Sequence, residues 1–438
     1  MNLMGPEYEI VKDPVHGYVK LYDHEKKIVD TPIFQRLRRI KQLSVADYVY
    51  PGAVHTRFSH CLGVMHVAGV FTETLLQKIQ DISQTEREKY FYLMRLWGLC
   101  HDLGHGPFSH LFDDEILVSR NEDHETLSAK IVKGDPSIAG IKFPCDISAE
   151  QLSSIMTSQE DWPLNEPLGK TGVSEQIFKY VCTGVFSADI IDYLLRDSLF
   201  TGAGYGDVDW QRLVFLSHPV GNRVLLEPRA EDAFDSFLLA RLFTFSTVYY
   251  HRTVRAFAKM AGWFLRDLDT AGFFREYIGD SKAYSRLDES ILVPKMAEGT
   301  SKFGLALLER KSPYSIIDEI SLNIAEPDQA QYLDGGIMTK AVRDAMGTSA
   351  ANLPEESFFV DTPKIELNPM LYEQKIGFRG RESNEEPRDR DIRLTRWGVL
   401  SPAVGVARLY IHDDQVSLVN TIRDAFRNPI KKKSHVHM

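Results

Sequence analysis

Three of the fourteen histidines of the chain fall within residues 101–110. This stretch begins with His101 and Asp102, an adjacent pair that offers one nitrogen and one oxygen ligand to a single divalent ion. Side chains next to each other do not normally point from the same helix face, so the pair predicts a helix end, with Gly104, Gly106 and Pro107 as the break. The alternative is a polar helix end whose histidines bind terminal carbonyls. The number of polar groups in so short a stretch favours a catalytic site.

Arg57 and His60 form a second candidate pair, three residues apart at the start of an expected helix. They share one helix face, and the unpaired backbone N–H groups of a first turn attract anions. The pair therefore suits an anionic ligand beside a metal. An ordinary polar first turn is the equally simple alternative.

A third set lies on the helix expected over residues 187–197. Asp189, Tyr193 and Asp197 follow one another at intervals of four and so share a stripe of that helix. Two acids and a tyrosine are costly to bury unless something compensates them. A metal at Asp189 would do so, and so would a plain solvated face.

Together these sets yield four candidate metal ligands from three helices: His60, His101, Asp102 and Asp189. Two nitrogen and two oxygen donors suit Mg, Mn, Fe, Ni or Zn, with positions left open for water and phosphate oxygens. The chemistry implied is metal-assisted hydrolysis of a phosphate ester.

The elements that must position these residues are mostly helical. An alternating N-terminal segment predicts a hairpin or extended arm, and helical periodicity recurs through the first two thirds of the chain. The expected elements are the arm over residues 7–23, a helix from Pro32 capped by Asp30 or Thr31, and helices from about 57, over 86–100, from 124, over 187–197 and over 231–270.

After residue 276 the pattern changes to shorter segments with strand signals. We therefore expect a mainly α protein, with a helical core and N-terminal arm over residues 1–275 and a smaller α+β domain over residues 276–438. The strand signals lie at 358–360, 365–367 and 406–412, and the charge-rich stretch 379–393 is expected to be a mobile loop.

The composition is that of an ordinary globular protein, with 43% hydrophobic and 26% charged residues. No segment approaches the roughly 20 apolar residues of a membrane span, and no secretory signal is recognised, so we expect a cytoplasmic protein without membrane contact. The net charge of -10 argues against a dedicated nucleic-acid surface. The four cysteines contain no CxxC pair, which indicates neither a zinc knuckle nor a disulfide framework.

The order of the motifs resembles the H…HD…D signature of HD-domain phosphohydrolases, which implies an HD-domain helical core. Within that superfamily the chain is similar to the HD-domain deoxynucleoside triphosphate triphosphohydrolases. The segments that carry the resemblance are DPVHGYVKL (13–21), DTPIFQRLRRIKQL (30–43), VYPGAVHTRFSHCLGV (49–64), GLCHDLGHGPFSHLFD (98–113) and DIIDYLLRD (189–197).

The resemblance implies hydrolysis of a deoxynucleoside triphosphate to deoxynucleoside and inorganic triphosphate, with water attacking the α-phosphorus. It assigns one divalent metal to the four candidate ligands. The catalytic roles that it implies are His110 as general acid, His105 and His124 at phosphate oxygens, and Asp113 orienting His124. The substrate contacts that it implies are Arg57 at the α-phosphate, Tyr193 and Arg241 at the triphosphate, Gln42 and Asp197 at the sugar 3′-hydroxyl, and Tyr249 where a 2′-hydroxyl would lie.

The resemblance also implies a regulatory guanine nucleotide, GTP or dGTP, at a subunit interface, and hence a homodimer or homotetramer. Asp30, Gln35 and Arg38 match the residues that read its base, and their donors and acceptors suit a guanine edge. A solvated helix face is the alternative. Three positions depart from the mammalian pattern. Glu9 in the arm and Ile190 in the active site each stand where that pattern has a phosphate-binding lysine, and Lys12 stands where its arm has an asparagine.

Two other functions stay open. One is an HD phosphohydrolase that acts on another phosphoester, such as a nucleoside monophosphate or a cyclic dinucleotide. The other is a non-catalytic nucleotide sensor. Gln42, Asp197 and Tyr249 favour the triphosphohydrolase because they suit a deoxyribose, and the complete ligand set favours an enzyme.

Overall fold

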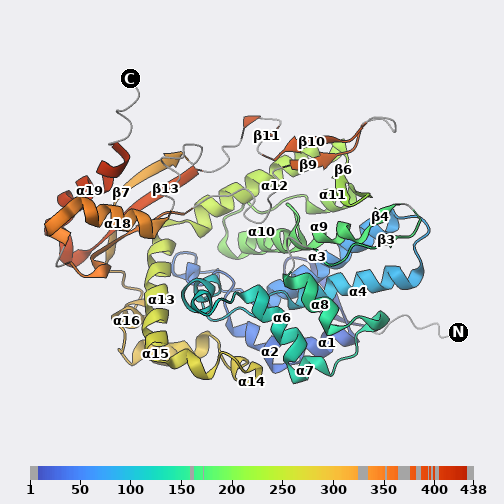
Figure 1. Ribbon diagram of the computed structural model, residues 1–438, viewed down its shortest axis with the longest axis horizontal. Coiled ribbons are helices and arrows are strands. Elements are labelled where there is room, and N and C mark those ends of the chain that lie inside the picture. The colour runs from blue at the N-terminus through green and yellow to red at the C-terminus, as the bar shows by residue number, and fades with distance from the viewer. Residues whose placement is uncertain are drawn as a thin grey trace.

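The computed structural model describes most of the chain, and helices make up most of it (Figure 1). The expectation of a mainly α fold with a smaller strand-containing C-terminal region is confirmed. Within the described ranges no helix is long and apolar enough to cross a membrane. The structure describes residues 8–157, 162–170, 172–323, 334–350, 353–363, 375–380, 386–392, 394–395, 398–399 and 404–431.

Three helices form the centre of the core: α3 (Arg57–Gln77), α4 (Gln84–Cys100) and α10 (Ala188–Thr201). Most residues of α3 are buried, because it packs on both of the other helices and is apolar on several sides. α4 starts at a capping box formed by Ser83 and Glu86. It ends just before the His-Asp pair, so the predicted helix end is confirmed.

The N-terminal arm is an antiparallel hairpin of β1 (Tyr8–Asp13) and β2 (Gly17–Tyr22), as predicted. Arg95 of α4 ties the hairpin to the core by donating to the carbonyl oxygen of Lys20 at 2.7 Å. The same guanidinium forms a buried ion pair with Glu25, which follows the hairpin. The arm is therefore a fixed part of the helical body.

The helix predicted after Thr31 is shorter than expected. Thr31 caps α2 (Pro32–Gln35), and the chain then continues as a single 3-10 turn. Arg36 in this turn is fully buried and donates to the carbonyl oxygens of Leu103 and Leu287, at 2.6 and 2.9 Å. These long-range bonds give the buried guanidinium two backbone acceptors, which lowers the cost of burying its charge.

The long helix expected over residues 231–270 is divided in two. α12 (Glu231–Thr244) widens into a π-type turn and ends before α13 (Arg252–Thr270) begins. His251 leaves the helical conformation, and its Nδ1 accepts from the backbone N–H of Thr253 as the cap of α13. Apolar periodicity continues across this cap, so the pattern alone predicted one helix.

A smaller α+β unit lies at one end of the molecule (Figure 1). Its sheet has β13 (Val404–His412) between β7 (Tyr314–Asn323) and β8 (Phe358–Asp361), with both pairings antiparallel. α18 (Gly335–Met346) and α19 (Val419–Lys431) share a second apolar cluster with this sheet.

The strands predicted at 358–360 and 406–412 are confirmed, and the one at 365–367 lies outside the described residues. The first apolar cluster continues past the expected boundary at residue 275 as far as Leu307 and also includes a few residues of the C-terminal region. The boundary itself stays a prediction.

The charge-rich stretch 379–393 is not a loop throughout. In its described part, β10 (Arg388–Asp391) pairs antiparallel with β9 (Lys375–Phe378), and β9 lies beside β6 (Arg223–Leu226) of the helical core. The C-terminal region thus adds two strands to a four-stranded sheet that begins in the core.

Acids on α12 explain why this charged segment is ordered. Arg390 donates to Asp235 at 2.6 Å, and Arg388 pairs with Glu231. The arginines therefore have partners in the fold, which composition alone could not reveal.

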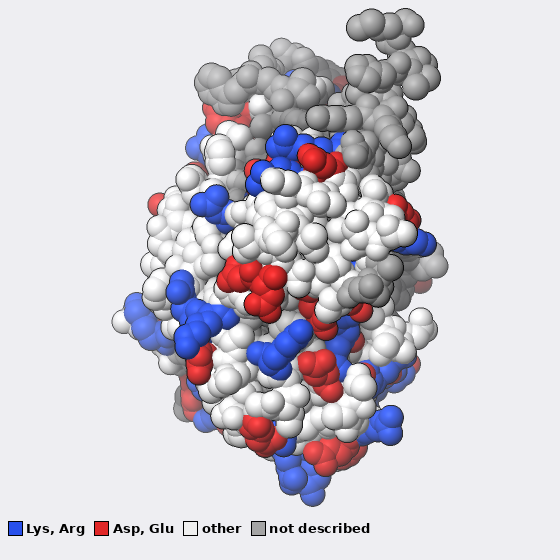
Figure 2. Space-filling model, turned by 90° about the vertical axis from the view of Figure 1, so that its left-hand side faces the viewer, with Lys and Arg blue, Asp and Glu red and all other residues white. Residues whose placement is uncertain are grey.

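The remaining elements are short and complete the two units. They are α1 (Asp23–Val29), α5 (His110–Phe112), α6 (His124–Gly134), α7 (Pro136–Ala139), α8 (Ala149–Thr157), β3 (Pro167–Leu168), β4 (Val173–Ser174), α9 (Phe178–Thr183), α11 (Trp210–Phe215), β5 (Ser217–Val220), α14 (Ser281–Tyr284), α15 (Leu292–Ala297), α16 (Lys302–Leu308), β11 (Leu394–Thr395) and β12 (Gly398–Val399). On the face shown in Figure 2, basic and acidic side chains are interspersed among uncharged ones.

Candidate active site

The four predicted metal ligands converge where α3, α4 and α10 meet. His60 projects from α3, His101 and Asp102 follow α4, and Asp189 lies in the first turn of α10. Nε2 of His60 lies 3.0 Å from Oδ1 of Asp189 and 3.7 Å from Oδ2 of Asp102. Nε2 of His101 lies 3.2 Å from Oδ1 of Asp102 and 3.9 Å from Oδ1 of Asp189. Donor atoms from three helices therefore face one point.

This donor set fits a divalent cation. Nδ1 of His101 lies 2.9 Å from the carbonyl oxygen of Gly98, which can only accept, so Nδ1 carries the proton and Nε2 is free to bind a metal. That Nε2 is buried and has no hydrogen-bond partner among the described residues. Burial opposes charge on His60, but hydrogen bonds to Asp189 and Asp192 outweigh it and raise the pKa of His60 to about 10. The carboxylates thus favour a proton on His60. A bound metal cation would take the place of that proton on Nε2.

The turn after the His-Asp pair is strained at two residues that are not glycine. Phe108 (φ 65°) and Ser109 (φ 57°) both have positive φ, and such conformations cost of order 1–3 kcal/mol each. Arg57 holds the turn, since its Nε donates to Oγ of Ser109 at 2.9 Å and its Nη1 donates to the carboxylate of Asp102. Ser109, which the sequence did not single out, links this arginine to the turn.

Neither Gly104 nor Gly106 has a positive φ, so neither uses the left-handed conformations that favour glycine. They permit close packing instead. A Cβ on Gly104 would lie 2.1 Å from the carbonyl oxygen of His124, and a Cβ on Gly106 would lie 2.3 Å from the ring of Phe112. The missing side chain of Gly104 lets α6 approach this stretch, and that of Gly106 leaves room for the ring of Phe112 in α5.

A second group of polar side chains surrounds Asp113. Its Oδ2 lies 2.6 Å from Nδ1 of His124, 3.4 Å from Nδ1 of His110 and 3.6 Å from Nδ1 of His105. The rings of His105 and His124 stack with centroids 3.8 Å apart. Nε2 of His105 also lies 3.4 Å from Oδ1 of Asp102, so the two groups adjoin.

The three histidines differ in burial and charge. His105 is fully buried, and burial holds its pKa well below the usual range, so it is neutral. Burial also opposes charge on His124, but the hydrogen bond and charge of Asp113 outweigh it and raise the pKa of His124. The side chain of His110 is 67% exposed and can meet a ligand that enters from solvent. The cluster therefore combines a neutral imidazole, a more basic one and an accessible one.

Arg241 of α12 is buried without an anionic partner among the described residues. Its side chain is 2% exposed, and its Nε and Nη1 have no hydrogen-bond partner there. Burial raises the pKa of the Tyr193 hydroxyl on α10, and the positive charge of Arg241 opposes this rise. An uncompensated buried charge costs several kcal/mol, so this site is suited to an anionic ligand.

Asp197 lies two turns after Asp189 on the same face of α10. It contacts Tyr249, one of the residues predicted to bind the sugar, and His55. The hydroxyl of Tyr249 donates to its Oδ2, and Nε2 of His55 lies 2.8 Å from its Oδ1. Gln42 donates from its backbone N–H to the carbonyl oxygen of His55 at 3.0 Å, and its Oε1 is buried without a partner in the described part of the chain. The rings of Tyr193 and Tyr249 lie 6.3 Å apart. His55 was missed from the sequence, although it stands in the same short motif as the first metal ligand.

The predicted regulatory residues lie near one another at the start of the core. Nε of Arg38 donates to Oε1 of Gln35 at 2.8 Å. Asp30 is exposed at the end of α1, and Glu9 of the hairpin forms an ion pair with the same helix. The amide and guanidinium are thus in contact, and Glu9 already has a cationic partner.

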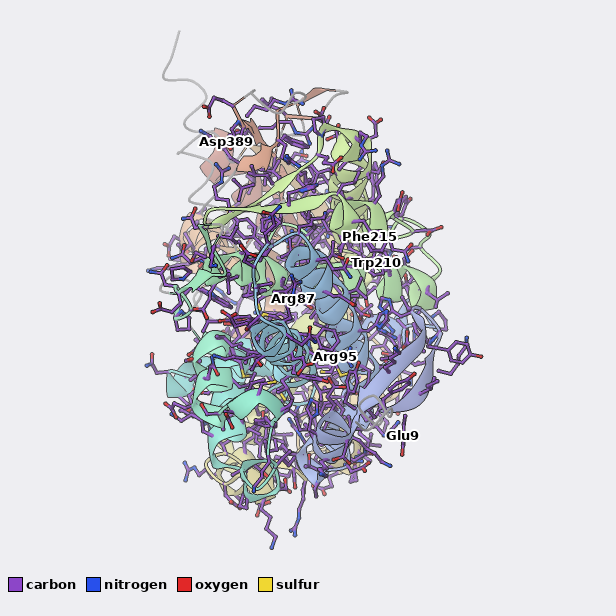
Figure 3. All side chains as sticks on the ribbon, turned by 90° about the vertical axis from the view of Figure 1, so that its right-hand side faces the viewer. Glu9, Arg87, Arg95, Trp210, Phe215 and Asp389 are labelled. Atoms are coloured by element: carbon purple, nitrogen blue, oxygen red, sulfur yellow. The ribbon has the colours of Figure 1, made fainter. Side chains whose placement is uncertain are left out.

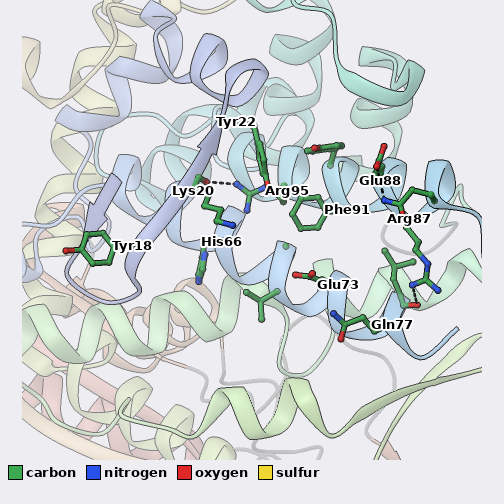
Figure 4. A pocket seen from close by; sticks show the side chains of 15 residues that line it. Tyr18, Lys20, Tyr22, His66, Glu73, Gln77, Arg87, Glu88, Phe91 and Arg95 are labelled. Carbon is green, nitrogen blue, oxygen red and sulfur yellow. Dashed lines mark hydrogen bonds between the residues drawn. The ribbon is translucent and has the colours of Figure 1, made fainter. Parts of the chain in front are cut away.

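A separate cavity of about 490 Å³ lies between the hairpin, α3 and α4 (Figure 4). Tyr22, His66 and Phe91 help to line it, and Arg95 reaches across it to the backbone of Lys20. The predicted site residues do not line this cavity, so it is distinct from the candidate active site.

Residues 57–167 match the HD domain family. This range begins at Arg57 and contains three of the four converging ligands, His60, His101 and Asp102. Three of the four converging residues therefore lie in the matched HD domain, and Asp189 follows it in the chain.

The chain is homologous to deoxynucleoside triphosphate triphosphohydrolases named SAMHD1 and to the bacterial protein YwfO. It is 30% identical over 327 residues to the SAMHD1 homolog of Dictyostelium discoideum, covering 71% of this chain and 60% of the relative. It is 47% identical over 225 residues to SAMHD1 of Homo sapiens, covering 47% and 35%. It is 30% identical over 257 residues to uncharacterised YwfO of Bacillus subtilis, covering 57% and 53%. The match thus spans less than two thirds of each of these relatives.

Two solved structures share the fold. A hypothetical protein from Aquifex aeolicus is 25% identical with a TM-score of 0.72, covering 96% of this chain and 100% of that one. A phosphohydrolase from Bacteroides thetaiotaomicron is 22% identical with a TM-score of 0.68, covering 93% and 100%. The similarity extends well beyond the HD domain into the C-terminal region.

Proposed function

We propose that this protein is a metal-dependent phosphohydrolase that converts deoxynucleoside triphosphates to deoxynucleoside and inorganic triphosphate. The observation that carries the proposal is the convergence of His60, His101, Asp102 and Asp189 beside the histidine cluster around Asp113. The names of the SAMHD1 relatives support the substrate class.

His60, His101, Asp102 and Asp189 would hold one divalent ion, with Mg, Mn, Fe, Ni and Zn all suited to two imidazoles and two carboxylates. When bound, such an ion supplies Lewis acidity at a phosphoryl oxygen and lowers the pKa of water. The chain keeps His101 ready as a ligand through the hydrogen bond of its Nδ1 to Gly98.

The neighbouring side chains supply charge and protons. Arg57, held at the strained turn, would neutralise an α-phosphate oxygen. Asp113 stabilises the charged form of His124. His124 and the neutral His105 would donate hydrogen bonds to phosphate oxygens and stabilise the negative charge that develops there. His110, which is exposed, would protonate the departing 5′ oxygen of the deoxynucleoside as general acid.

The substrate would extend from this centre along α10. Arg241 and Tyr193 would bind the triphosphate, which provides the anion that the buried guanidinium lacks. Gln42 and Asp197 would hold the 3′-hydroxyl. Tyr249, fixed by its hydrogen bond to Asp197, would occupy the space of a 2′-hydroxyl and thereby select deoxyribose.

A substrate panel tests the proposal. The protein would be incubated with deoxynucleoside and ribonucleoside triphosphates, nucleoside monophosphates and a cyclic dinucleotide, each with several divalent metals. We expect turnover of deoxynucleoside triphosphates and loss of turnover in EDTA and in His101→Ala. A matched control is His412→Ala in β13, which should behave as wild type. Turnover of only another phosphoester, or retained activity in His101→Ala, would reject the proposal.

A regulatory guanine nucleotide is the second part of the proposal. Asp30, Gln35 and Arg38 would read its base at an interface between copies of the chain in a dimer or tetramer. Gel filtration and rate measurements with and without GTP or dGTP would detect this. We expect nucleotide-dependent assembly that Gln35→Ala weakens; unchanged assembly and rate would contradict it.

A further inference from the structure

The imidazole of His60 is held from both sides. Its Nε2 faces Asp189 at 3.0 Å, toward the converging ligands, and its Nδ1 lies 2.7 Å from Oδ2 of Asp192. A carboxylate that accepts from Nδ1 keeps the proton on that nitrogen and leaves the lone pair of Nε2 directed at the metal position. Asp192 lies off the helix stripe that carries Asp189, so its role could not be predicted from the sequence.

We propose that Asp192 is a positioning residue for the metal ligand His60 and that the turn of the N-terminal hairpin, through His16, is part of its support. This inference rests on the proposed metal site. It extends that site to the N-terminal hairpin, because His16 contacts Asp192 and Asp192 contacts His60.

Arg196 is the first support of Asp192. It lies one turn further along α10, and its Nε and Nη2 donate to Oδ2 and Oδ1 of Asp192, both at 2.8 Å. Both side chains are fully buried. This two-point pairing keeps the carboxylate charged and prevents its rotation away from His60.

His16 is the second support and comes from the hairpin. Its Nε2 lies 2.7 Å from Oδ1 of Asp192, and both side chains are buried. Asp13 at the end of β1 shapes this turn, because its Oδ1 accepts from the backbone N–H of His16 at 2.9 Å. Asp13 also binds Arg196 at 2.9 Å, so the turn and α10 share one ion-pair network.

The surroundings leave little freedom for this network. The ring of His16 meets the ring of Trp210 edge-on at 6.0 Å, and Figure 3 labels Trp210 on the side of the molecule where the hairpin lies. On α3, a Cβ at Gly63 would lie 1.8 Å from Oδ1 of Asp192. Gly63 therefore allows α3 to approach the carboxylate of Asp192. His60, which this carboxylate holds, lies one turn before Gly63 on α3.

The consequence is that a displaced hairpin would release one oxygen of Asp192 and loosen His60. Supporting residues of this kind typically change metal affinity by about 10- to 100-fold when they are removed. The arm would thus influence metal binding without contacting the metal.

The test is Mn²⁺ binding to metal-free protein, measured by calorimetry or by the EPR signal of free Mn²⁺, below the unfolding temperature. Asp192→Ala should weaken Mn²⁺ binding about 10- to 100-fold. It also leaves Arg196 without its partner, so its folding is checked by circular dichroism. His16→Phe keeps the ring packing and the Arg196 pair, removes only the hydrogen bond, and should still weaken Mn²⁺ binding measurably.

Asp361→Asn is the matched control, because Asp361 forms a partly buried two-point pair with Arg255 far along the chain. It should bind Mn²⁺ as wild type does. The inference is overturned if folded Asp192→Ala or His16→Phe binds Mn²⁺ with wild-type affinity. The proposed function fails separately, if wild-type protein binds Mn²⁺ and hydrolyses no deoxynucleoside triphosphate.

Discussion

Nδ1 of His124 lies 2.6 Å from Oδ2 of Asp113, so this carboxylate both orients the imidazole and stabilises its charged form. Burial opposes the charged form of His124. The hydrogen bond to Asp113 and the negative charge of Asp113 outweigh burial, so the pKa of His124 is raised. The histidine therefore stays protonated to a higher pH than a free imidazole would.

Asp113→Asn should lower kcat by about 100-fold or more, as the loss of a positioned acid-base group does. The pKa of His124 would fall, so the alkaline limb of the pH–rate profile should move to lower pH. Glu309→Gln, a change at an exposed acid that pairs with Lys311, is the control and should leave the profile in place. An Asp113→Asn profile with an unmoved alkaline limb would show that Asp113 does not set the protonation of His124.

Arg241→Met should separate stability from binding. Removing a buried cation that has no anionic partner in the described part of the chain should raise the unfolding free energy of the ligand-free protein by about 1 kcal/mol or more. The KM for deoxynucleoside triphosphate should rise, because the triphosphate loses its buried counter-charge. Thermal unfolding and steady-state kinetics check both effects. A less stable variant with unchanged KM would mean that Arg241 serves the fold and not the ligand.

Tyr249→Ala should relax sugar selectivity. The ring is held by Asp197, and its removal opens the space proposed to exclude a 2′-hydroxyl. The ratio of kcat/KM for dGTP to that for GTP should fall by roughly 10- to 100-fold. Tyr205→Ala, at an exposed tyrosine, provides the comparison and should keep the wild-type ratio. If Tyr249→Ala keeps the same dGTP-to-GTP ratio of kcat/KM as Tyr205→Ala, Tyr249 does not determine sugar selectivity.

Glu289 should make stability depend on pH. Burial raises its pKa to about 7, although it accepts from the backbone N–H groups of Lys41 and Phe108. Since the folded pKa lies above the ordinary value, the fold binds a proton that the unfolded chain releases, and stability falls as pH rises from about 4.5 to about 7. Glu289→Gln should therefore raise the Tm relative to wild type at about pH 8 and not at about pH 4. A Tm difference that is the same at both pH values would contradict this assignment.

The convergence of His60, His101, Asp102 and Asp189 could be predicted from the sequence because each residue belongs to a short local pattern. An adjacent His-Asp pair at a helix end, a histidine in a first turn and an acid in another first turn are visible without the fold. The hairpin and the strands at 358–360 and 406–412 were likewise local patterns, and the structure confirms them.

Features that depend on distant partners could not be predicted. The strain at Phe108 and Ser109 is held by Arg57, some fifty residues earlier, and the order of β10 depends on acids of α12. The break after Tyr249 follows from a cap that apolar spacing does not mark. Ion pairs and caps of this kind are tertiary contacts that outweigh local propensity.

The central claim is that the bond broken joins the α-phosphorus to the 5′ oxygen of the deoxynucleoside. The most direct measurement is ³¹P NMR of the products of dGTP hydrolysis in water enriched in ¹⁸O, with nucleoside measured in parallel by chromatography. We predict equal amounts of deoxyguanosine and inorganic triphosphate, with ¹⁸O on a terminal phosphorus of the triphosphate. Formation of diphosphate with dGMP, or of phosphate with dGDP, would contradict the account.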